Sequence, residues 1–378
     1  FLARKIFRKF NGNFTFVIIT DREDLDTQIY RNFLDMGACQ KADTSRPKNS
    51  KELREVLATN KRYIFTLIQK FRIDKGKQYP LVSERDDIIV LVDEAHRTQY
   101  KDLAENMRIA LPNAQYMAFT GTPLLGKNNK TNKWFGNYVS EYNFAQAIAD
   151  GATVPLYYDK RLPELHVINE ELDDELAEIV EEEELNEKQQ EILERKYAST
   201  IGAITRDDRL ETVAKDIAAH FPRRGYLGKG MVVCIDKFTT VKMHNKVSHY
   251  IKEERKTLQK ELSKCNDEVL KESLKKSLSF LKEIKLAVVI SKDAKDLERF
   301  KERGLDLKTH HDRLDAVDEN GQNVEDNFKD PNNPLQLVFV CAMWLTGFDA
   351  PTVSTLYLDK PMQNHTLMQT IARANRVA

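Results

Sequence analysis

Short apolar runs divide the N-terminal part of the chain into a regular alternation of expected strands and helices. Strand-like runs occur at 14–20, 63–68, 88–92 and 115–120, with helical patterns between them. The run 88–92 is entirely aliphatic, which is typical of a strand buried on both faces. This alternation predicts an α/β domain with a parallel sheet and right-handed crossovers.

A second α/β block begins with the apolar run 230–235. Further strand-like runs follow at 286–290, 335–341 and 355–358. Between the first two runs, the strongly charged segment 252–285 carries leucines at intermittent helical intervals. This pattern predicts a helical hairpin inserted between two strands of a second parallel sheet.

Composition narrows the class of protein. A chain of 378 residues is long enough for two domains with ample cores. The chain has 59 Lys and Arg residues and 59 Asp and Glu residues, so its formal net charge is +0. This balance does not by itself indicate a protein that binds polyanions, although basic patches can occur locally on a neutral protein. The four cysteines show no Cys-x-x-Cys spacing, so no zinc site or disulfide framework is expected. No apolar stretch approaches the roughly 20 residues of a membrane span.

The strand 88–92 leads directly into Asp93-Glu94-Ala95-His96. Open α/β sheets bind ligands at the carboxyl ends of their strands. Asp93 is therefore a candidate Mg²⁺ ligand, and Glu94 is a candidate for orienting a water that attacks a phosphoryl group. The alternative is that both carboxylates cap the following helix.

Two further segments carry candidate chemistry. The run 115–120 ends in a Thr-Gly-Thr-Pro turn, which offers the hydroxyls of Thr120 and Thr122. Near the C-terminus, Gln369, Arg373 and Arg376 are spaced by four and three residues, which aligns them on one face of a helix. Two guanidiniums on one face suit a polyphosphate, although a solvated helix face has the same pattern.

These motifs together resemble a family. The order DEAH, TGTP and QxxxRxxR resembles motifs II, III and VI of superfamily 2 nucleic-acid-dependent ATPases. Thr346-Gly347-Phe348-Asp349 resembles motif V, and the segment 16–25 resembles motif Ia. The segment 142–158 and the phrase 345–351 are similar to the motor (R) subunit of type I restriction enzymes.

The resemblance implies an α/β fold of two RecA-like motor domains with ATP and Mg²⁺ as cofactors. The expected parts are a first domain at 1–165, an acidic helical linker at 166–228 and a second domain at 229–378 with the insertion 252–285. Within the linker, residues 170–187 are mostly acidic. They are expected to form a solvated helix, with a mobile element that competes with DNA phosphate as the alternative.

Roles for individual residues follow from the same resemblance. Asp93 would hold Mg²⁺ through water, Glu94 would polarise the attacking water, and Gln369 would help to position the arginine fingers Arg373 and Arg376. The other implied roles are coupling of nucleotide state to DNA (His96, Thr120, Thr122), contact with the nucleotide (Gly347, Asp349) and contact with nucleic-acid phosphates (Thr20, Arg22, Thr346).

The implied function is an ATP-dependent translocase of double-stranded DNA in a type I restriction endonuclease. Its partners would be methylase and specificity subunits in a prokaryotic cytoplasm, with no membrane, and DNA cleavage would belong to a nuclease domain of the parent subunit outside these residues. Two alternatives are another superfamily 2 DNA or RNA helicase or remodeller, and a catalytically dead DNA-binding scaffold.

One departure from the family pattern concerns the P-loop. No G-x-x-x-x-G-K-[ST] motif precedes Asp93, and the similar spacing at 121–127 is followed by Asn128 and lies after the acidic motif. Residues 1–10 already show a helical apolar pattern. We therefore expect that the chain begins inside the first motor domain, and that these residues alone do not hydrolyse ATP because nothing replaces the P-loop lysine and its backbone amides.

The arginine pair generates a prediction for the intact motor. Substitution Arg376→Ala should slow ATP hydrolysis far more than it weakens ATP binding, because an arginine finger acts mainly on charge that develops in the transition state. Turnover and ATP affinity should be measured with saturating duplex DNA. Unchanged turnover in both Arg373→Ala and Arg376→Ala would assign the two residues to a solvated helix face.

Overall fold

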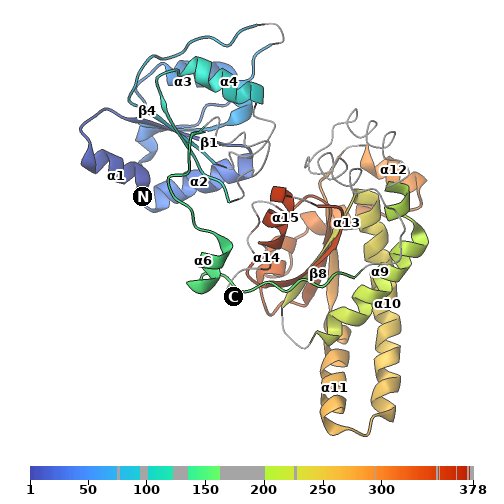
Figure 1. Cartoon of the computed structure of the whole chain (residues 1–378). Coiled ribbons are helices and arrows are strands. Elements are labelled where there is room, and N and C mark those ends of the chain that lie inside the picture. Colours follow the sequence, from blue (N-terminus) through green and yellow to red (C-terminus); the bar gives the residue numbers. More distant parts are fainter. Residues whose placement is uncertain are drawn as a thin grey trace. The chain divides into compact units, whose positions relative to one another are not determined.

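The computed structural model describes most of the chain, and residues 75–76, 94–100, 122–134, 162–200, 225–227, 294, 346–347, 349, 363, 373 and 375–378 lie outside the described part. The chain divides into two compact units, Phe1–Glu141 and Tyr142–Ala378, each with its own parallel sheet (Figure 1). This division falls before the boundary predicted at 165. Most of the linker predicted at 166–228 lies outside the described residues, and it stays a prediction.

The first unit contains a five-stranded sheet in the order β2-β3-β1-β4-β5, with every pair parallel. Its strands are β1 (Thr15–Thr20), β2 (Thr44–Ser45), β3 (Tyr63–Leu67), β4 (Ile88–Val92) and β5 (Gln115–Ala118). Its helices are α1 (Leu2–Lys9), α2 (Glu23–Asp35), α3 (Ser50–Leu57) and α4 (Lys101–Ala110), with short 3-10 turns at Lys41–Asp43 and Ile68–Phe71. The parallel sheet predicted from the apolar runs is confirmed.

Both faces of this sheet are covered by helices, which explains the unbroken apolar runs. Along β1 the side chains alternate, so Phe16 packs with residues of α1 and α2 and Val17 packs with residues of α3 and α4. All six residues of β1 and all five of β4 are buried. At about 25 cal/mol per Å² of apolar area, this burial on two faces is the main stabilisation of the unit.

The second unit contains a four-stranded sheet in the order β7-β8-β6-β9, again entirely parallel. Its strands are β6 (Lys229–Cys234), β7 (Lys285–Val289), β8 (Leu335–Val340) and β9 (Val353–Asp359). Its helices are α6 (Phe144–Ala149), α9 (Asp207–His220), α10 (Lys237–Lys264), α11 (Glu268–Glu283), α12 (Asp296–Glu302), α13 (Lys308–Asp315), α14 (Val324–Lys329) and α15 (Asn364–Ile371), with a 3-10 turn at Phe221–Arg223. The two-sheet α/β architecture expected from the sequence is confirmed.

The helical hairpin predicted at 252–285 is present, but its first helix is longer than expected. Helix α10 starts at Lys237, directly after β6, and continues without a break for 28 residues into the hairpin. Figure 1 shows α10 and α11 running side by side. Leu258, Leu274 and Leu278 of these helices are buried in one hydrophobic cluster. Asp267 caps α11 by accepting backbone hydrogen bonds from Val269 and Leu270.

Among the residues that the structure describes, no helix is long and apolar enough to cross a membrane.

A pair of half-buried histidines lies against one face of the second sheet. The ring of His244 on α10 lies 4.8 Å from that of His310 on α13 and 5.4 Å from that of Phe339 on β8. Burial lowers the pKa of His244 to about 4, opposed by a hydrogen bond with Asn245 and assisted by the charge of Arg313 and, when it is protonated, by that of His310. Burial also lowers the pKa of His310. Both rings are therefore neutral in the folded protein at neutral pH.

This arrangement predicts a pH dependence of stability. Between the ordinary pKa of 6.5 and the folded-state pKa of about 4, the unfolded chain binds a proton at His244 that the folded chain does not. The free energy of unfolding should therefore fall as pH decreases through this window, by up to about 3 kcal/mol. His244→Gln should reduce this loss in denaturant titrations, whereas His249→Gln, at an exposed position of the same helix, should not. Equal pH profiles for the wild type and His244→Gln would contradict the assignment.

Candidate functional site

The carboxyl ends of three strands lie in a row at one edge of the first sheet. Beyond the ends of the strands, the amide of Asp93 donates to the carbonyl of Ile19 at 2.9 Å, and the amide of Phe119 donates to the carbonyl of Val92 at 2.8 Å. The backbone ladder therefore brings together the ends of β1, β4 and β5. These are the places where the sequence predicted the chemistry of motifs Ia, II and III.

Asp93 occupies the carboxyl end of the central, fully buried strand β4 and is itself partly exposed. A carboxylate held at this position by a rigid strand can meet a ligand without moving the backbone. Mg²⁺ is usually held by one or two carboxylates with phosphate oxygens and waters, rather than by a cage of protein ligands. Within the described ranges, no group of three or more His, Cys, Asp or Glu side chains is arranged to hold a metal ion. A single ligand such as Asp93 fits a magnesium–nucleotide complex.

Thr20 and Arg22, two residues predicted to contact nucleic acid, lie at the end of β1 and differ in exposure. Thr20 is only 1% exposed, and its hydroxyl donates to the carbonyl of Arg22 at 3.3 Å. Its side chain therefore orders the turn. Arg22 is partly exposed, so it is the residue of this pair whose side chain reaches the surface.

The same turn is fixed by a residue that the sequence reasoning missed. Gln69 follows β3, and its side-chain amide donates to the carbonyl of Asp21 at 2.6 Å. Its neighbour Lys70 donates to the carbonyl of Pro47 at 2.6 Å, which ties the end of β3 to the segment after β2. The polar pair at 69–70 directly after an apolar strand was the available signal.

The third strand end carries Thr120, which is partly exposed, beside Phe119, which is 45% exposed. This places Thr120 at the same sheet edge as Asp93. Several other predicted residues lie outside the described part of the chain, and nothing is added to their assignment: Glu94, His96, Thr122, Thr346, Gly347, Asp349, Arg373 and Arg376.

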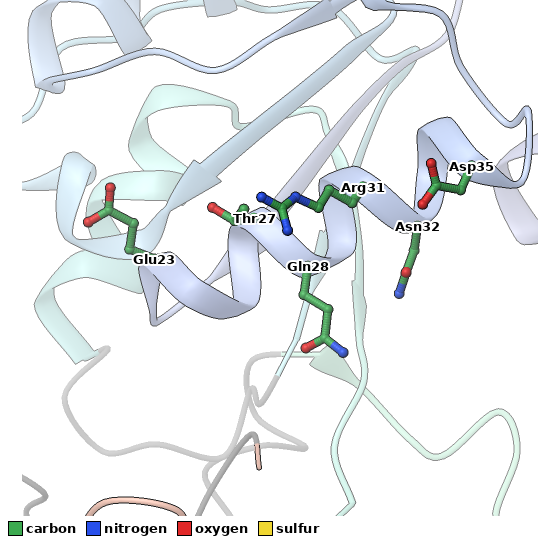
Figure 2. A pocket seen from close by; sticks show the side chains of 6 residues that line it. All are labelled: Glu23, Thr27, Gln28, Arg31, Asn32 and Asp35. Atoms are coloured by element: carbon green, nitrogen blue, oxygen red, sulfur yellow. The ribbon is translucent and has the colours of Figure 1, made fainter. Parts of the chain in front are cut away.

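A shallow pocket of about 470 Å³ lies beside α2 (Figure 2). Figure 2 shows its six labelled side chains along this one helix: Glu23, Thr27, Gln28, Arg31, Asn32 and Asp35. The lining mixes acidic, basic and neutral groups, and it includes neither Asp93 nor Thr120. This pocket is therefore a polar helix face and does not coincide with the predicted site.

In the second unit, the last described helix carries Gln369 of the predicted arginine motif. Helix α15 includes Gln369, but it ends at Ile371, and the amide of Ala374 donates to the carbonyl of Ile371 at 3.1 Å in a tighter turn. Arg373 and Arg376 lie outside the described residues, so their alignment with Gln369 on one helix face stays a prediction. Gln369 is 7% exposed, and its Oε1 has no hydrogen-bond partner among the described residues.

Two ion pairs brace the carboxyl edge of the second sheet. At the end of β9, the carboxylate of Asp359 accepts from Arg209 of α9 at 2.5 Å. Burial raises the pKa of Asp359, and the charge and hydrogen bond of Arg209 oppose that rise. At the start of α10, Lys237 pairs with the buried Asp296 of α12 at 2.6 Å. Neither pair was foreseen from the sequence, since partners 59 and 150 residues apart leave no local pattern.

The turn after β8, which contains the predicted motif V, has an unusual backbone at Trp344. Its φ of 68° is the only positive value at a non-glycine position in the described residues. For a residue with a Cβ this costs on the order of 1–2 kcal/mol. The Trp344 ring is stacked on that of Phe348 with centroids 4.2 Å apart.

Comparison with known proteins agrees with this arrangement. Residues 1–191 match the family model of the SWI2/SNF2 ATPase, and residues 268–378 match that of type I restriction enzyme subunit R domain 3. A putative type I restriction enzyme MjaIXP endonuclease subunit from Methanocaldococcus jannaschii is 36% identical over 383 residues, covering 100% of this chain and 32% of the relative. The type I restriction enzyme HindI endonuclease subunit from Haemophilus influenzae is 34% identical over 382 residues, covering 97% of this chain and 32% of the relative.

Among solved structures, the Hef helicase domain of Pyrococcus furiosus covers 100% of this chain and 86% of its own, with 14% identity and a TM-score of 0.40. The fold is defined by the two parallel sheets themselves.

The two parallel sheets and the family matches place the chain in a class of α/β ATPase domains. The chain belongs to the SWI2/SNF2 ATPase family and, within it, to the helicase-like region of type I restriction enzyme endonuclease subunits. It spans about a third of the length of the curated relatives that it matches, 32% in both cases.

The anchoring of the β1 turn gives a testable prediction. Gln69→Leu removes the donor to the Asp21 carbonyl, so the free energy of unfolding should fall by about 1–2 kcal/mol. Gln28→Leu, on the exposed face of α2, should change it by less than about 0.5 kcal/mol. Denaturant titration of both variants measures the difference, and equal stabilities would show that this hydrogen bond does not hold the turn.

Proposed function

We propose that this chain is the motor region of a type I restriction endonuclease subunit, and that it uses ATP hydrolysis to translocate double-stranded DNA. The observation that carries the proposal is the position of Asp93, at the carboxyl end of a strand buried on both faces and in line with the ends of β1 and β5. Membership of an ATPase family supports the reaction type. The relatives' printed names support the restriction system.

In this proposal ATP is the nucleotide and Mg²⁺ its metal, which together supply phosphoryl transfer when bound. Asp93 would hold the metal, and Glu94 would orient the attacking water. Thr120 contributes its hydroxyl from the neighbouring strand end. His96 and Thr122 take the coupling roles that the family resemblance implies for them.

In the same proposal, the residues of motifs V and VI come from the second unit. Arg373 and Arg376 stabilise charge on the transferring phosphoryl group, and Gln369 supports them. Gly347 and Asp349 contact the nucleotide, while Thr346 and Arg22 contact nucleic-acid phosphates. Such backbone contacts give affinity without sequence information. Recognition of a DNA site is therefore expected to come from partner methylase and specificity subunits, and cleavage from a nuclease domain of the parent subunit.

Two other functions are separable by experiment. A helicase or remodeller of another superfamily 2 branch would respond to RNA, or would separate strands. A catalytically dead scaffold would bind DNA without hydrolysis. The match of residues 268–378 to the R-subunit domain favours the restriction motor over both.

The complete subunit, assembled with its partners, should hydrolyse ATP faster with duplex DNA than with RNA. Asp93→Ala and Glu94→Gln should each abolish hydrolysis and translocation while leaving subunit assembly intact. The first variant lacks the carboxylate proposed to hold the metal, and the second lacks the carboxylate proposed to orient the attacking water. The matched control is Asp74→Asn, which removes an exposed carboxylate of the same unit that pairs with Lys77. Normal hydrolysis by Asp93→Ala would exclude this edge as the catalytic site, and stimulation by RNA alone would exclude a DNA motor.

A further inference from the structure

The part of α10 that forms the hairpin has a basic outer side. Four exposed lysines follow one another along it at intervals of four residues: Lys252, Lys256, Lys260 and Lys264. Residues four apart are neighbours on a helix surface, so the set forms a continuous line of ammonium groups. The buried residues Ile251 and Leu258 lie on the opposite side of the helix, toward the core. We call these four residues the lysine ladder.

The carboxylates of the same helix leave most of the ladder without a counter-charge. Glu254 and Glu261 both pair with the guanidinium of Arg223, at 2.7 and 3.0 Å, so their charges are engaged at the base of the hairpin. Glu253 pairs with Lys256 at 2.9 Å. The other three lysines of the ladder make no ion pair with a residue that the structure describes. The outer side of α10 therefore carries a net positive charge, although the whole chain is neutral.

Helix stability does not account for the ladder. Like charges four residues apart repel, so each successive pair of lysines destabilises the helix. A glutamate in place of every second lysine would reverse this effect, as Glu325 and Lys329 of α14 show by pairing at 2.6 Å. An anion lying along the helix removes the same repulsion. The spacing of the ladder is thus typical of a surface that meets a line of negative charges.

The ladder stands on a firmly held scaffold. Leu258 of α10 and Leu274 of α11 are buried in the hydrophobic cluster that covers one face of the second sheet. The hydroxyl of Ser277 on α11 donates to the carbonyl of Pro222 at 2.9 Å, beside Arg223 in the same 3-10 turn. Both helices are therefore tied to the core. A ligand on the ladder has only to order lysine side chains, which keeps the entropic cost of binding small.

The ladder also lies away from the carboxyl edge of the second sheet. Helix α10 starts there, directly after β6, and its 28 residues span about 42 Å, whereas the 6 residues of β6 span about 20 Å. Lys252 is about 22 Å along the helix from Lys237. Figure 1 shows the hairpin extending beyond the strands of its own unit. The ladder is therefore separate from the strand ends of that sheet.

We propose that the lysine ladder is a further contact site for duplex DNA, which it binds through the phosphate backbone without reading sequence. The identity of the polyanion rests on the proposed function. The ladder is about 18 Å long, and duplex DNA carries one negative charge per about 1.7 Å of its axis, so every lysine can meet a phosphate. The exposed residues between the lysines include Thr257, Gln259 and Ser263, which offer little apolar area to a protein partner. Such contacts do not depend on base sequence, so they hold the duplex equally well at every step of translocation.

The test is the salt dependence of duplex DNA binding by the complete subunit, measured without its partner subunits so that their DNA contacts do not contribute. The ladder variant carries Lys252→Gln, Lys256→Gln, Lys260→Gln and Lys264→Gln. Each phosphate contact contributes about 0.9 to the slope of log K against log salt concentration, so this slope should decrease in magnitude by about 3. The loss of affinity between about 50 and about 200 mM salt should then be about sixtyfold smaller than in the wild type. Arginine at the same four positions keeps the charge and should keep the slope.

The second helix of the hairpin supplies a matched control. Four lysines of α11 alternate with carboxylates such as Glu268 and Glu272, so this helix has no unbroken basic side. The control variant replaces these lysines by glutamine: Lys271, Lys275, Lys276 and Lys282. It removes the same charge from the same hairpin, yet it should change the slope by less than about 1. Equal decreases in the two variants would show an effect of net charge alone and would overturn the proposal.

The remaining outcomes separate this contact from the proposed function. The ladder variant should not have a lower unfolding midpoint than the wild type, because it removes repulsion between exposed lysines. An unchanged slope in this variant overturns the DNA contact, and loss of assembly with partner subunits alongside it would show a protein contact instead. Absence of measurable duplex binding by the wild type at low salt overturns the contact as well. A reduced slope together with no stimulation of ATP hydrolysis by duplex DNA in the assembled wild type would keep the contact and reject the motor.

Discussion

Burial of parallel strands on both faces is the constraint on which the rest of this structure depends. A strand such as β4, with no exposed side chain, can carry no chemistry along its length, so polar groups are confined to its ends. The parallel ladder then aligns these ends, since the amide of Asp93 bonds to Ile19 and that of Phe119 bonds to Val92. The packing that stabilises the first unit thus also assembles its candidate site.

In the second unit, ion pairs help to fix the positions of the helices at the carboxyl edge of the sheet. The pairs Arg209–Asp359 and Lys237–Asp296 join helices to the carboxyl edge of the sheet. Buried ion pairs contribute little net stability, because desolvation offsets their attraction, but breaking one leaves an uncompensated charge. Their effect is therefore on geometry, since they fix where α9 and α12 meet the strand ends. The stacked rings of Trp344 and Phe348 add an apolar contact after β8.

Sequence reasoning succeeded where a signal is local. The apolar run before Asp93, the alternation of strands and helices and the leucine spacing of the hairpin are all visible in short windows, and all correspond to elements of the structure. It could not show in which direction a side chain points or which distant residue it contacts. Thr20 was expected to contact phosphate, yet it is buried and bonded to its own turn. Gln69 was overlooked because its partner lies 48 residues away.

The sequence by itself determined the fold class, the family and the identity of the candidate motifs, because periodicity and motif spacing are properties of neighbouring residues. The tertiary structure alone decided which motif residues reach the surface, where the helix containing Gln369 ends and which backbone conformation Trp344 adopts. Those outcomes depend on contacts such as Phe328 with Trp344, which join different elements. Ring packing between distant segments can hold a residue in a backbone conformation that its own local preference disfavours, and no local pattern records that competition.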